Sequence, residues 1–360
     1  MSTGSVIVVP MSDRPFIAAR VEDRLIAVLN GLLRGRGWSE RVVGYTGYGN
    51  RRFVRVLARV VLTPDPDHVP LPVARTLDRR GWRNFLTAPA LRAKVTVRTG
   101  DRFSTAHVSR NGYLDLRILE HGLEPGWRTV SVETEEAPPV EVPVRILEDD
   151  VDFGIVSDID DTVISTSLPR PLLAFWNTFV LQESARQPVP GMSELYQKLL
   201  AERPGSPLVY VSTGAWNTAP TLARFLGHHE FPRGPLLLTD WGPTNTGWFR
   251  SGPEHKLNCL HALAHDFPEI SWVLIGDDGQ HDPSLYNEFA TRFPDRVRAI
   301  GIRQLNAVEQ VLAHGTPMTL LEEQLSSGPH GPAPEVRAPD GRGLWELLSR
   351  VLAREPSPTP

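Results

Sequence analysis

The sequence predicts an α/β protein, with a doubly wound parallel sheet preceded by an N-terminal β-sandwich-like domain. From about residue 41 to residue 146, apolar and polar residues alternate with period two, which is typical of antiparallel strands. After residue 149, short apolar runs alternate with segments of helical periodicity, which is typical of strand–helix units in a parallel sheet. Two of these apolar runs end in clusters of acidic residues. The first domain is therefore expected to be all-β, and the second to carry the chemistry.

Length and composition fit a globular protein of two domains. The chain has 360 residues, of which 41% are hydrophobic and 22% charged. A net charge of −4 gives no indication of a nucleic-acid partner, and we expect none. The one cysteine, Cys259, excludes an internal disulfide and fits a reducing compartment.

No targeting or membrane-spanning segment is expected. No run approaches the roughly 18 apolar residues that a transmembrane helix needs, and the N-terminus lacks a signal-peptide pattern. We expect a cytoplasmic protein, with a peripheral position at a membrane as the alternative.

Residues 1–40 form the first predicted segment, which contains an amphipathic helix at 14–34. Its apolar residues fall near one face, and Gly35 and Gly37 end it. Packing of this face on the following domain is the favoured interpretation. Binding to a membrane surface is the other one.

Residues 41–148 form the predicted β-sandwich-like accessory domain. Turn signals such as Asn111-Gly112 separate its short alternating runs. The predicted strands cover residues 53–62, 93–98, 105–108, 113–118, 129–132 and 140–144.

Residues 149–325 form the predicted α/β domain, and residues 326–360 a flexible tail with a short helix at 344–353. Residues 168–190 are too long for a tight connection, so we expect them to form a small lid. Trp176 and Phe179 within this lid could face acyl chains or pack inward. The predicted strands cover residues 153–157, 208–212, 235–239, 271–275 and 297–302, and the predicted helices cover 191–202, 218–227, 255–266, 283–293 and 304–312.

The acidic run Asp158-Ile-Asp160-Asp-Thr162 directly follows the first apolar strand of this domain. In open α/β sheets the carboxyl ends of the strands are where ligands bind. Three acids so close together repel one another unless a cation or a phosphate-binding site uses them. Taken alone, the run could also be an acidic turn that caps the next helix.

Three further elements are predicted to reach the same edge. Ser212 and Thr213 end one apolar strand, and Asp277 ends another. Lys256 lies at the start of a helix, and Asp282 follows Asp277 by five residues. Each has a plainer interpretation: Ser212 as a strand-end hydroxyl, Lys256 as a surface charge, and Asp282 before a proline as a helix N-cap.

Together these residues suit phosphoryl transfer. Asp158 and Asp277 offer the hard oxygen ligands that Mg²⁺ prefers. Ser212 can hydrogen-bond a phosphoryl oxygen, and Lys256 can offset negative charge in the transition state. An aspartate can attack phosphorus, while Asp160 protonates the leaving oxygen and later activates water.

The order of these residues resembles the four motifs of the haloacid dehalogenase superfamily. Over roughly residues 150–305 the resemblance narrows to its phosphatidate phosphatase family, and it rests on the runs Ser157–Thr162, Tyr210–Trp216, Gly234–Gly242, His255-Lys256 and Ile275–Asp282. The β-rich region is similar in kind only. Two positions depart from the family pattern: Gly214-Ala215 replaces a frequent Ser-Pro, and Asp278 replaces a usual serine. Neither change removes a reacting group, but both bear on substrate fit.

The resemblance implies a haloacid dehalogenase-like, Rossmannoid fold and a role for each motif residue. Asp158 would be the nucleophile and Asp160 the general acid and base, with Ser212 and Lys256 as further catalytic residues. The candidate Mg²⁺ ligands are Asp158, the backbone carbonyl of Asp160, Asp277 and Asp282. The candidate substrate-binding residues are Thr162, Thr213, Gly214 and Trp216.

The expected function is a Mg²⁺-dependent phosphatase that forms an aspartyl-phosphate and acts on phosphatidate or a related lipid phosphate. A phosphatase of soluble phosphomonoesters is the first alternative, because the chemistry defines only the phosphoryl group. An inactive binding or scaffold module on the same fold is the second, and the intact set of reacting residues argues against it.

Overall fold

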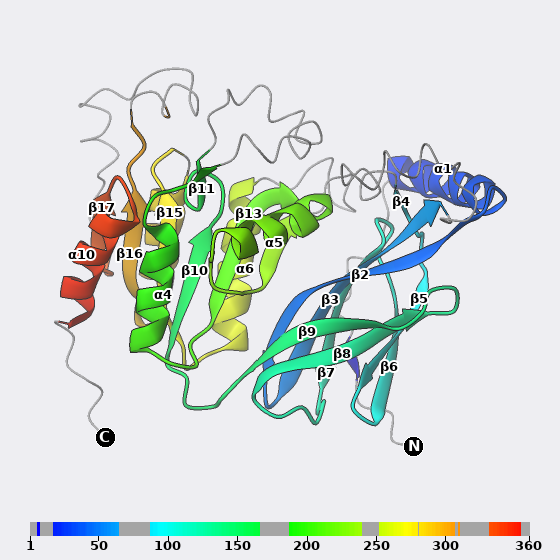
Figure 1. The fold of residues 1–360 in the computed structure, drawn as a ribbon, viewed down its shortest axis with the longest axis horizontal. Coiled ribbons are helices and arrows are strands. Elements are labelled where there is room, and N and C mark those ends of the chain that lie inside the picture. The colour runs from blue at the N-terminus through cyan, green and yellow to red at the C-terminus, as the bar shows by residue number, and fades with distance from the viewer. Residues whose placement is uncertain are drawn as a thin grey trace. The chain divides into compact units, whose positions relative to one another are not determined.

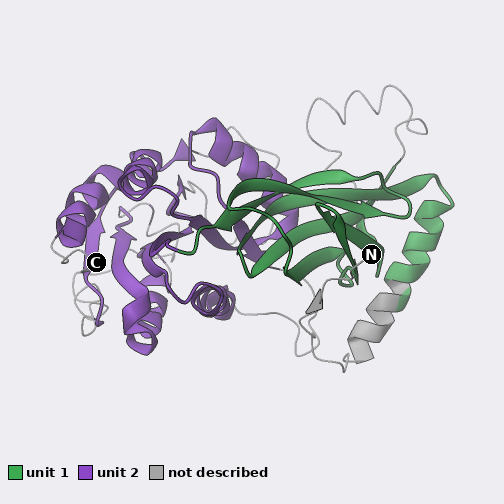
Figure 2. Cartoon of the chain, turned by 90° about the horizontal axis from the view of Figure 1, so that it is seen from below, with its two compact units in different colours: residues 1–149, 240–250 green, residues 150–239, 251–360 purple. Residues whose placement is uncertain are grey.

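The computed structural model divides the chain into two compact units, with the boundary between Asp149 and Asp150 (Figure 2). It describes residues 6–7, 17–64, 87–165, 187–239, 252–279, 281–306, 309 and 331–353. Most of the predicted lid, with Trp176 and Phe179, lies outside these residues. Each unit is described by itself below.

Unit 1 is built on one continuous nine-stranded sheet. Its order is β1-β7-β3-β2-β9-β8-β5-β6, with β4 paired to β3, and all pairs except β2–β9 are antiparallel. The strands are β1 (Val6–Ile7), β2 (Trp38–Asn50), β3 (Phe53–Pro64), β4 (Ala88–Pro89), β5 (Lys94–Thr99), β6 (Arg102–His107), β7 (Tyr113–Leu119), β8 (Gly126–Thr134) and β9 (Val140–Leu147). The sheet curls (Figure 1), so alternate residues of its strands share one apolar core. The expected two-sheet sandwich is thus a single sheet folded on itself.

Strand β2 is the longest of the strands that sequence reasoning missed in this unit, besides the two-residue strands β1 and β4. Its glycines weaken the alternating pattern, but close packing requires them. A Cβ on Gly44 would lie 2.5 Å from a methyl group of Val142, and a Cβ on Gly47 would lie 2.3 Å from the carbonyl oxygen of Arg55. Glycine therefore marks close backbone approach here, not a loop.

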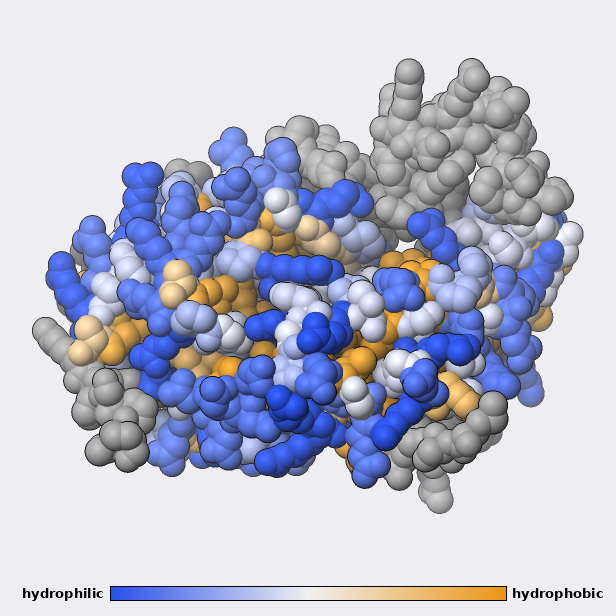
Figure 3. All heavy atoms as spheres, turned by 60° about the horizontal axis from the view of Figure 1, so that its bottom comes forward, coloured by the Kyte–Doolittle hydropathy of each residue, from blue (hydrophilic) through white to orange (hydrophobic). Residues whose placement is uncertain are grey.

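Helix α1 (Ile17–Arg34) is the predicted amphipathic helix, and Asn30 and Leu33, near its end, pack against the sheet and its core. Asn30 is buried and its side chain bonds the Pro89 carbonyl and the Leu91 amide. On another side, Val28, Leu29 and Leu32 are 63%, 45% and 53% exposed. The apolar residues of α1 are therefore shared between the core and the surface. On the face of the molecule drawn in Figure 3, apolar residues show between more numerous polar ones.

Unit 2 contains a six-stranded, fully parallel sheet. The strands, in spatial order, are β14 (Leu236–Thr239), β13 (Leu208–Ala215), β10 (Phe153–Asp158), β15 (Ser271–Asp277), β16 (Val297–Arg303) and β17 (Glu335–Ala338). β10 comes first in the chain and lies in the middle, because the later strands add first on one side and then on the other. The strand order thus reverses between β10 and β15, which is where open α/β sheets form their ligand sites.

Helices connect these strands close to the predicted positions. They are α4 (Met192–Glu202), α5 (Ala219–His228), α6 (Gly252–Asp266), α7 (Asp282–Arg292) and α10 (Gly341–Ala353), with short 3₁₀ turns η5 (Trp216–Thr218) and η6 (Pro294–Arg296). α4 packs on α10, and α6 packs on α7; Figure 1 shows α4 and α10 in front of the sheet. The helix expected at 304–312 does not include residues 304–306, which have no regular secondary structure and whose Gln304 amide bonds the Ala338 carbonyl; Glu309, the one other described residue of that range, is helical.

The C-terminal region contains the helix expected at 344–353, as α10, with Leu344 and Leu348 fully buried. The stretch before it, expected to be flexible, instead forms the edge strand β17. A four-residue strand carries too little periodicity to be recognised in sequence. In the described part of the chain, no helix has the length and hydropathy to cross a membrane.

Candidate active site

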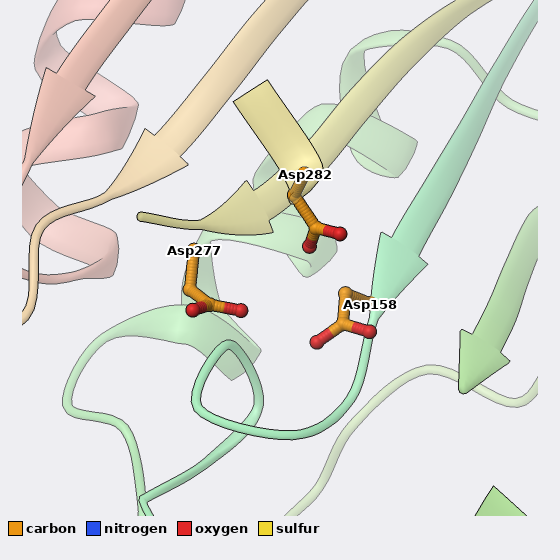
Figure 4. Close-up of side chains that lie close together, drawn as sticks. All are labelled: Asp158, Asp277 and Asp282. Carbon is orange, nitrogen blue, oxygen red and sulfur yellow. The ribbon is translucent and has the colours of Figure 1, made fainter. Parts of the chain in front are cut away.

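Three carboxylates meet where the strand order of unit 2 reverses. Asp158 ends β10, Asp277 ends β15, and Asp282 begins α7. One oxygen of each lies within 4.8 Å of the others, and all three residues are buried. Figure 4 shows their side chains pointing toward one another from these separate elements. The topology therefore brings together acids that lie more than a hundred residues apart in sequence.

Lys256 is the cation of this cluster. It lies in the first turns of α6, is 4% exposed, and places Nζ 2.6 Å from Asp158 Oδ1 and 2.5 Å from Asp282 Oδ1. The plainer interpretations of Lys256 as a surface charge and of Asp282 as an N-cap are therefore wrong. The N-cap of α7 is His281, and the Asp282 carboxylate bonds Lys256.

The charges in this cluster do not balance. Burial raises the pKa of Asp158, and Asp282 and Asp160 add to the rise, although Lys256 opposes it. Burial likewise raises the pKa of Asp277, with Asp282 and Asp158 contributing. For Lys256 the carboxylates outweigh the effect of burial, so its pKa is raised and the ammonium stays charged. One cation thus faces three buried carboxyl groups.

The residues present fit a divalent metal ion. Asp158, Asp277 and Asp282 each keep a buried Oδ2 atom without a hydrogen-bond partner in the described structure. Buried carboxylate oxygens normally have partners, because an unpaired one loses its hydration without compensation. Three carboxylates that each place an oxygen within 4.8 Å of the others form the hard, anionic donor set that Mg²⁺ prefers.

Asp160 and Ser212 form a second contact beside the carboxylate cluster. Ser212 Oγ donates to Asp160 Oδ2 at 2.8 Å and accepts from the Gly214 amide at 2.9 Å. The β13–β14 register shifts between Val211 and Ala215, an irregularity of the kind that re-aims side chains near active sites. Because the Ser212 hydroxyl faces the carboxyl group of Asp160, a bound phosphoryl oxygen would compete for it.

The loop after β10 is tightly wound. The amides of Val163 and Ile164 both donate to the Ile159 carbonyl, and the Asp161 amide donates to the Ile164 carbonyl. Within this loop Thr162 is buried, and its hydroxyl oxygen has no hydrogen-bond partner in the described residues. A buried hydroxyl of this kind is available to a ligand.

The other predicted substrate-binding residues gather at the carboxyl end of β13. Thr213 and Gly214 belong to that strand, and Trp216 begins η5. Their contact with substrate stays a prediction. Asp278 is set apart from the cluster, because its Oδ1 accepts from the Leu305 amide at 2.8 Å.

Arg303 is a buried charge at this edge that sequence reasoning missed. It is the last residue of β16 and its Nη1 donates to the Asp161 carbonyl at 2.7 Å. The available signal was a charged residue directly after the uncharged run 299–302, the same signal that marked Asp158 and Asp277.

Residues 153–304, which include the whole cluster, match the family model of the phosphatidate phosphatase APP1 catalytic domain. This part of unit 2 is therefore similar in sequence to that catalytic domain. Phosphatidate phosphatase APP1 of Saccharomyces cerevisiae is 28% identical over 164 residues, which are 45% of this chain and 28% of the yeast protein. An uncharacterized Schizosaccharomyces pombe protein is 28% identical over 154 residues, which are 42% of this chain and 25% of that protein. The chain thus spans about a quarter of the length of these relatives.

Solved structures resemble the chain only distantly. The HAD domain of the effector protein Lem4 from Legionella pneumophila is 12% identical with a TM-score of 0.29, and the match covers 44% of this chain and 88% of that one. A carbohydrate acetylesterase from Xanthomonas citri is 9% identical with a TM-score of 0.32, covering 85% of this chain and 71% of that one.

Proposed function

We propose that the protein is a Mg²⁺-dependent phosphatase that hydrolyses a phosphomonoester, phosphatidate or a related lipid phosphate, through an aspartyl-phosphate on Asp158. The observation that carries the proposal is the buried cluster of Asp158, Asp277, Asp282 and Lys256, within residues that match a phosphatidate phosphatase catalytic domain. The strand order, with its reversal between β10 and β15, also supports a doubly wound sheet of the haloacid dehalogenase type.

In this proposal one carboxylate oxygen of Asp158 attacks phosphorus and the bond to the leaving oxygen breaks. The Asp160 carboxyl group gives its proton to that oxygen, so a neutral alcohol departs. The Asp160 carboxylate then takes a proton from water, which attacks phosphorus, releases phosphate and restores Asp158. Lys256 holds Asp158 in place and offsets its charge as the anionic phosphate approaches.

Asp158, Asp277 and Asp282 would hold the Mg²⁺, with the Asp160 carbonyl as the further ligand that the family resemblance implies. When bound, the ion supplies positive charge that lowers the repulsion between the phosphate and the carboxylates. Asp160 and Ser212 need no ion for their own contact, since the Ser212 hydroxyl already orients the carboxyl group of Asp160.

The test is phosphate release from short-chain phosphatidate in detergent micelles, with Mg²⁺ or with a chelator. Asp158→Asn should lose activity by a factor of about 10³ or more, because an amide is a poor nucleophile and a poor metal ligand. Asp278→Asn is the matched control, since Asp278 directly follows the neighbouring strand β15 but bonds a backbone amide; it should keep most of its activity. Wild-type turnover by Asp158→Asn would refute the mechanism.

A substrate panel separates lipid phosphates from soluble ones. The proposal expects higher kcat/KM for phosphatidate than for a soluble phosphomonoester such as glycerol 3-phosphate. The reverse order, with Asp158 still required, would favour the soluble alternative.

Contact with a lipid surface belongs to the same proposal, and the exposed side chains Val28, Leu29 and Leu32 of α1 support it. Replacing these three by serine should lower co-sedimentation with phosphatidate-containing vesicles. Hydrolysis of glycerol 3-phosphate serves as the control and should stay unchanged. Equal sedimentation of both proteins would remove α1 from the proposal.

A further inference from the structure

Arg303 is a buried guanidinium beside the carboxylate cluster. In the sheet, Arg303 pairs with Asp277 of β15 and with Ala338 of β17. Its side chain is only 6% exposed. A buried arginine is costly unless all of its charge and donors are used. What the guanidinium binds is therefore informative.

The guanidinium of Arg303 joins three segments that lie far apart in sequence. Nη1 donates to the Asp161 carbonyl at 2.7 Å, Nη2 to Glu309 Oε1 at 2.6 Å, and Nε to the Pro339 carbonyl at 3.3 Å. The planar fork of arginine suits this, because it presents donors in several fixed directions at once. Arg303 thus connects the loop after β10 to the segment that follows β17.

The backbone that Arg303 holds directly follows the proposed general acid. Asp161 has φ of +59°, a left-handed conformation that few residues other than glycine, asparagine and aspartate adopt. Such a conformation persists when its surroundings impose it. The hydrogen bond from Arg303 fixes the Asp161 carbonyl, and so constrains the chain direction one residue after Asp160.

Glu309 extends the same network to the base of the predicted lid. Its carboxylate accepts from Arg303, from the Ser165 hydroxyl at 3.1 Å and from the Asn306 amide at 2.9 Å. Ser165 lies in β11 (Ile164–Ser165), which pairs with β12 (Gln187–Pro188) on the other side of the undescribed residues 166–186. Burial would raise the pKa of Glu309, but the hydrogen bonds from Arg303 and Asn306 outweigh it, so the pKa is lowered and the carboxylate stays charged.

We propose that Arg303 is a positioning residue for the general acid: it holds the Asp161 carbonyl so that the Asp160 carboxyl group faces the leaving oxygen. This inference rests on the proposed phosphatase function. Arg303 acts through Asp160 and touches no reacting atom. Its loss should therefore impair the step that needs a proton and leave phosphate binding nearly intact.

Leaving-group dependence distinguishes this role from a purely structural one. In Arg303→Lys a single ammonium keeps the charge but cannot reach all three acceptors. We expect kcat/KM for short-chain phosphatidate, whose alkoxide must be protonated, to fall about ten- to a hundredfold, the usual cost of a misplaced catalytic group. For 4-nitrophenyl phosphate, whose leaving group departs without a proton, kcat/KM should change less than about threefold, because kcat/KM reports phosphoryl transfer to Asp158 and not the later attack of water that Asp160 also assists.

Three further variants sharpen the test. Arg337→Lys is the matched control, because Arg337 lies on neighbouring β17 and pairs with Glu335 of the same strand; both substrates should be unaffected. Asp160→Asn combined with Arg303→Lys should lose no more activity on phosphatidate than Asp160→Asn alone. Glu309→Gln, which leaves the Asp161 contact in place, should show the same pattern with a smaller loss. Equal losses on both substrates, or additive losses in the double variant, would overturn the inference.

Amide hydrogen exchange tests the hydrogen bond between Arg303 and the Asp161 carbonyl without any enzyme assay. Exchange at residues 161–165 should rise at least several-fold in Arg303→Lys and stay unchanged in Arg337→Lys. Unchanged exchange in both would overturn the inference. A wild-type protein that hydrolyses neither substrate would instead refute the proposed function, while the exchange data would still decide whether Arg303 holds this loop.

Discussion

At the scale of single residues, the carboxylates around Lys256 are placed where they suit a ligand but lower the stability of the folded protein. Three buried carboxyl groups share one ammonium, and two of them have pKa values raised by burial and by their neighbours. Burying these carboxyl groups lowers the free energy of unfolding compared with the same groups in water or with apolar side chains in their place. The structure tolerates that cost because the cluster is anchored to β10 and β15, which are buried along nearly their whole length.

Removing the ammonium should show this cost directly. Lys256→Met leaves the carboxylates without their cation, and we expect a loss of about 3–5 kcal/mol in the free energy of unfolding at neutral pH. Millimolar Mg²⁺ should restore part of it, because the ion would bind the same oxygens. Thermal unfolding with and without Mg²⁺ is the measurement. A loss that Mg²⁺ does not change would show that the ion binds elsewhere.

His121 makes the stability of unit 1 depend on pH. Its ring is buried, with Nε2 2.8 Å from the Asn50 carbonyl and Nδ1 accepting from the Leu123 amide at 2.9 Å. Burial, opposed by the Asn50 carbonyl and assisted by Arg102, lowers its pKa. The unfolded chain therefore binds this proton more readily than the folded one.

We expect stability to fall as the pH drops below about 6.5, the unfolded value for histidine, and to level off below the lower folded pKa. The His121→Gln variant should show a smaller decrease in melting temperature between pH 7.5 and pH 5. His107→Gln, on the exposed side of β6, is the control and should behave as wild type. A pH profile that His121→Gln does not flatten would contradict the assignment.

At the scale of elements, glycines set how closely segments approach. The Gly341 amide donates to the Pro190 carbonyl, and a Cβ on Gly341 would lie 2.2 Å from backbone atoms of Gly191. Backbone cannot move aside as a flexible side chain can. The start of α10 is therefore seated against the start of α4 at a distance that only glycine permits.

Gly341→Ala should destabilise the protein by about 1–3 kcal/mol, the usual cost of overpacking. Gly227→Ala is the counterpart, because Gly227 lies in α5 with no atom near the added methyl group. It should stabilise the protein by about 0.5–1 kcal/mol through helix propensity. Chemical denaturation measures the free energy of unfolding of both variants. Similar changes in the two would contradict the steric argument.

Elements with strong local patterns were predictable from sequence, and those that depend on distant partners were not. The apolar strands β10, β13, β15 and β16 and helices α4 to α7 lie within a few residues of their predicted positions. Strand β2 was hidden because Gly44 and Gly47 meet backbone or side chains that are far away in sequence. Strand β17 is too short to show a period and exists because β16 offers it an edge.

The residues of the site also fall into a group that was predictable from sequence and a group that was not. Residues at strand ends were predictable, since topology alone brings Asp158, Ser212 and Asp277 to one edge. The contact of Asp282 with Lys256 and the reach of Arg303 to Asp161 depend on side-chain paths across the sheet. No spacing in the sequence encodes those paths.

At the scale of the whole molecule, the α/β unit needs its C-terminal segment. β17 covers the edge of β16, and Leu344 and Leu348 of α10 are fully buried. An uncovered edge next to lost apolar packing favours association between chains.

A chain that ends at residue 330 should therefore lose most of its phosphate-release activity and elute partly as aggregates in size-exclusion chromatography. A chain that ends at residue 353 is the control and should match the full-length protein in both measurements. Full activity of the shorter chain would show that β17 and α10 are dispensable for the site.

The contact between Arg303 and Pro339 also bears on how the protein folds while it is being synthesised. The two residues are 36 positions apart, and a ribosome adds about 5–20 residues each second, so a nascent chain passes roughly 2–7 seconds between them. During that interval β16 has no neighbour on one side, and Arg303 lacks one of its three acceptors. A chaperone that binds exposed strand edges has this window in which to act, and the loop beside Asp160 acquires its full set of contacts only when the window closes.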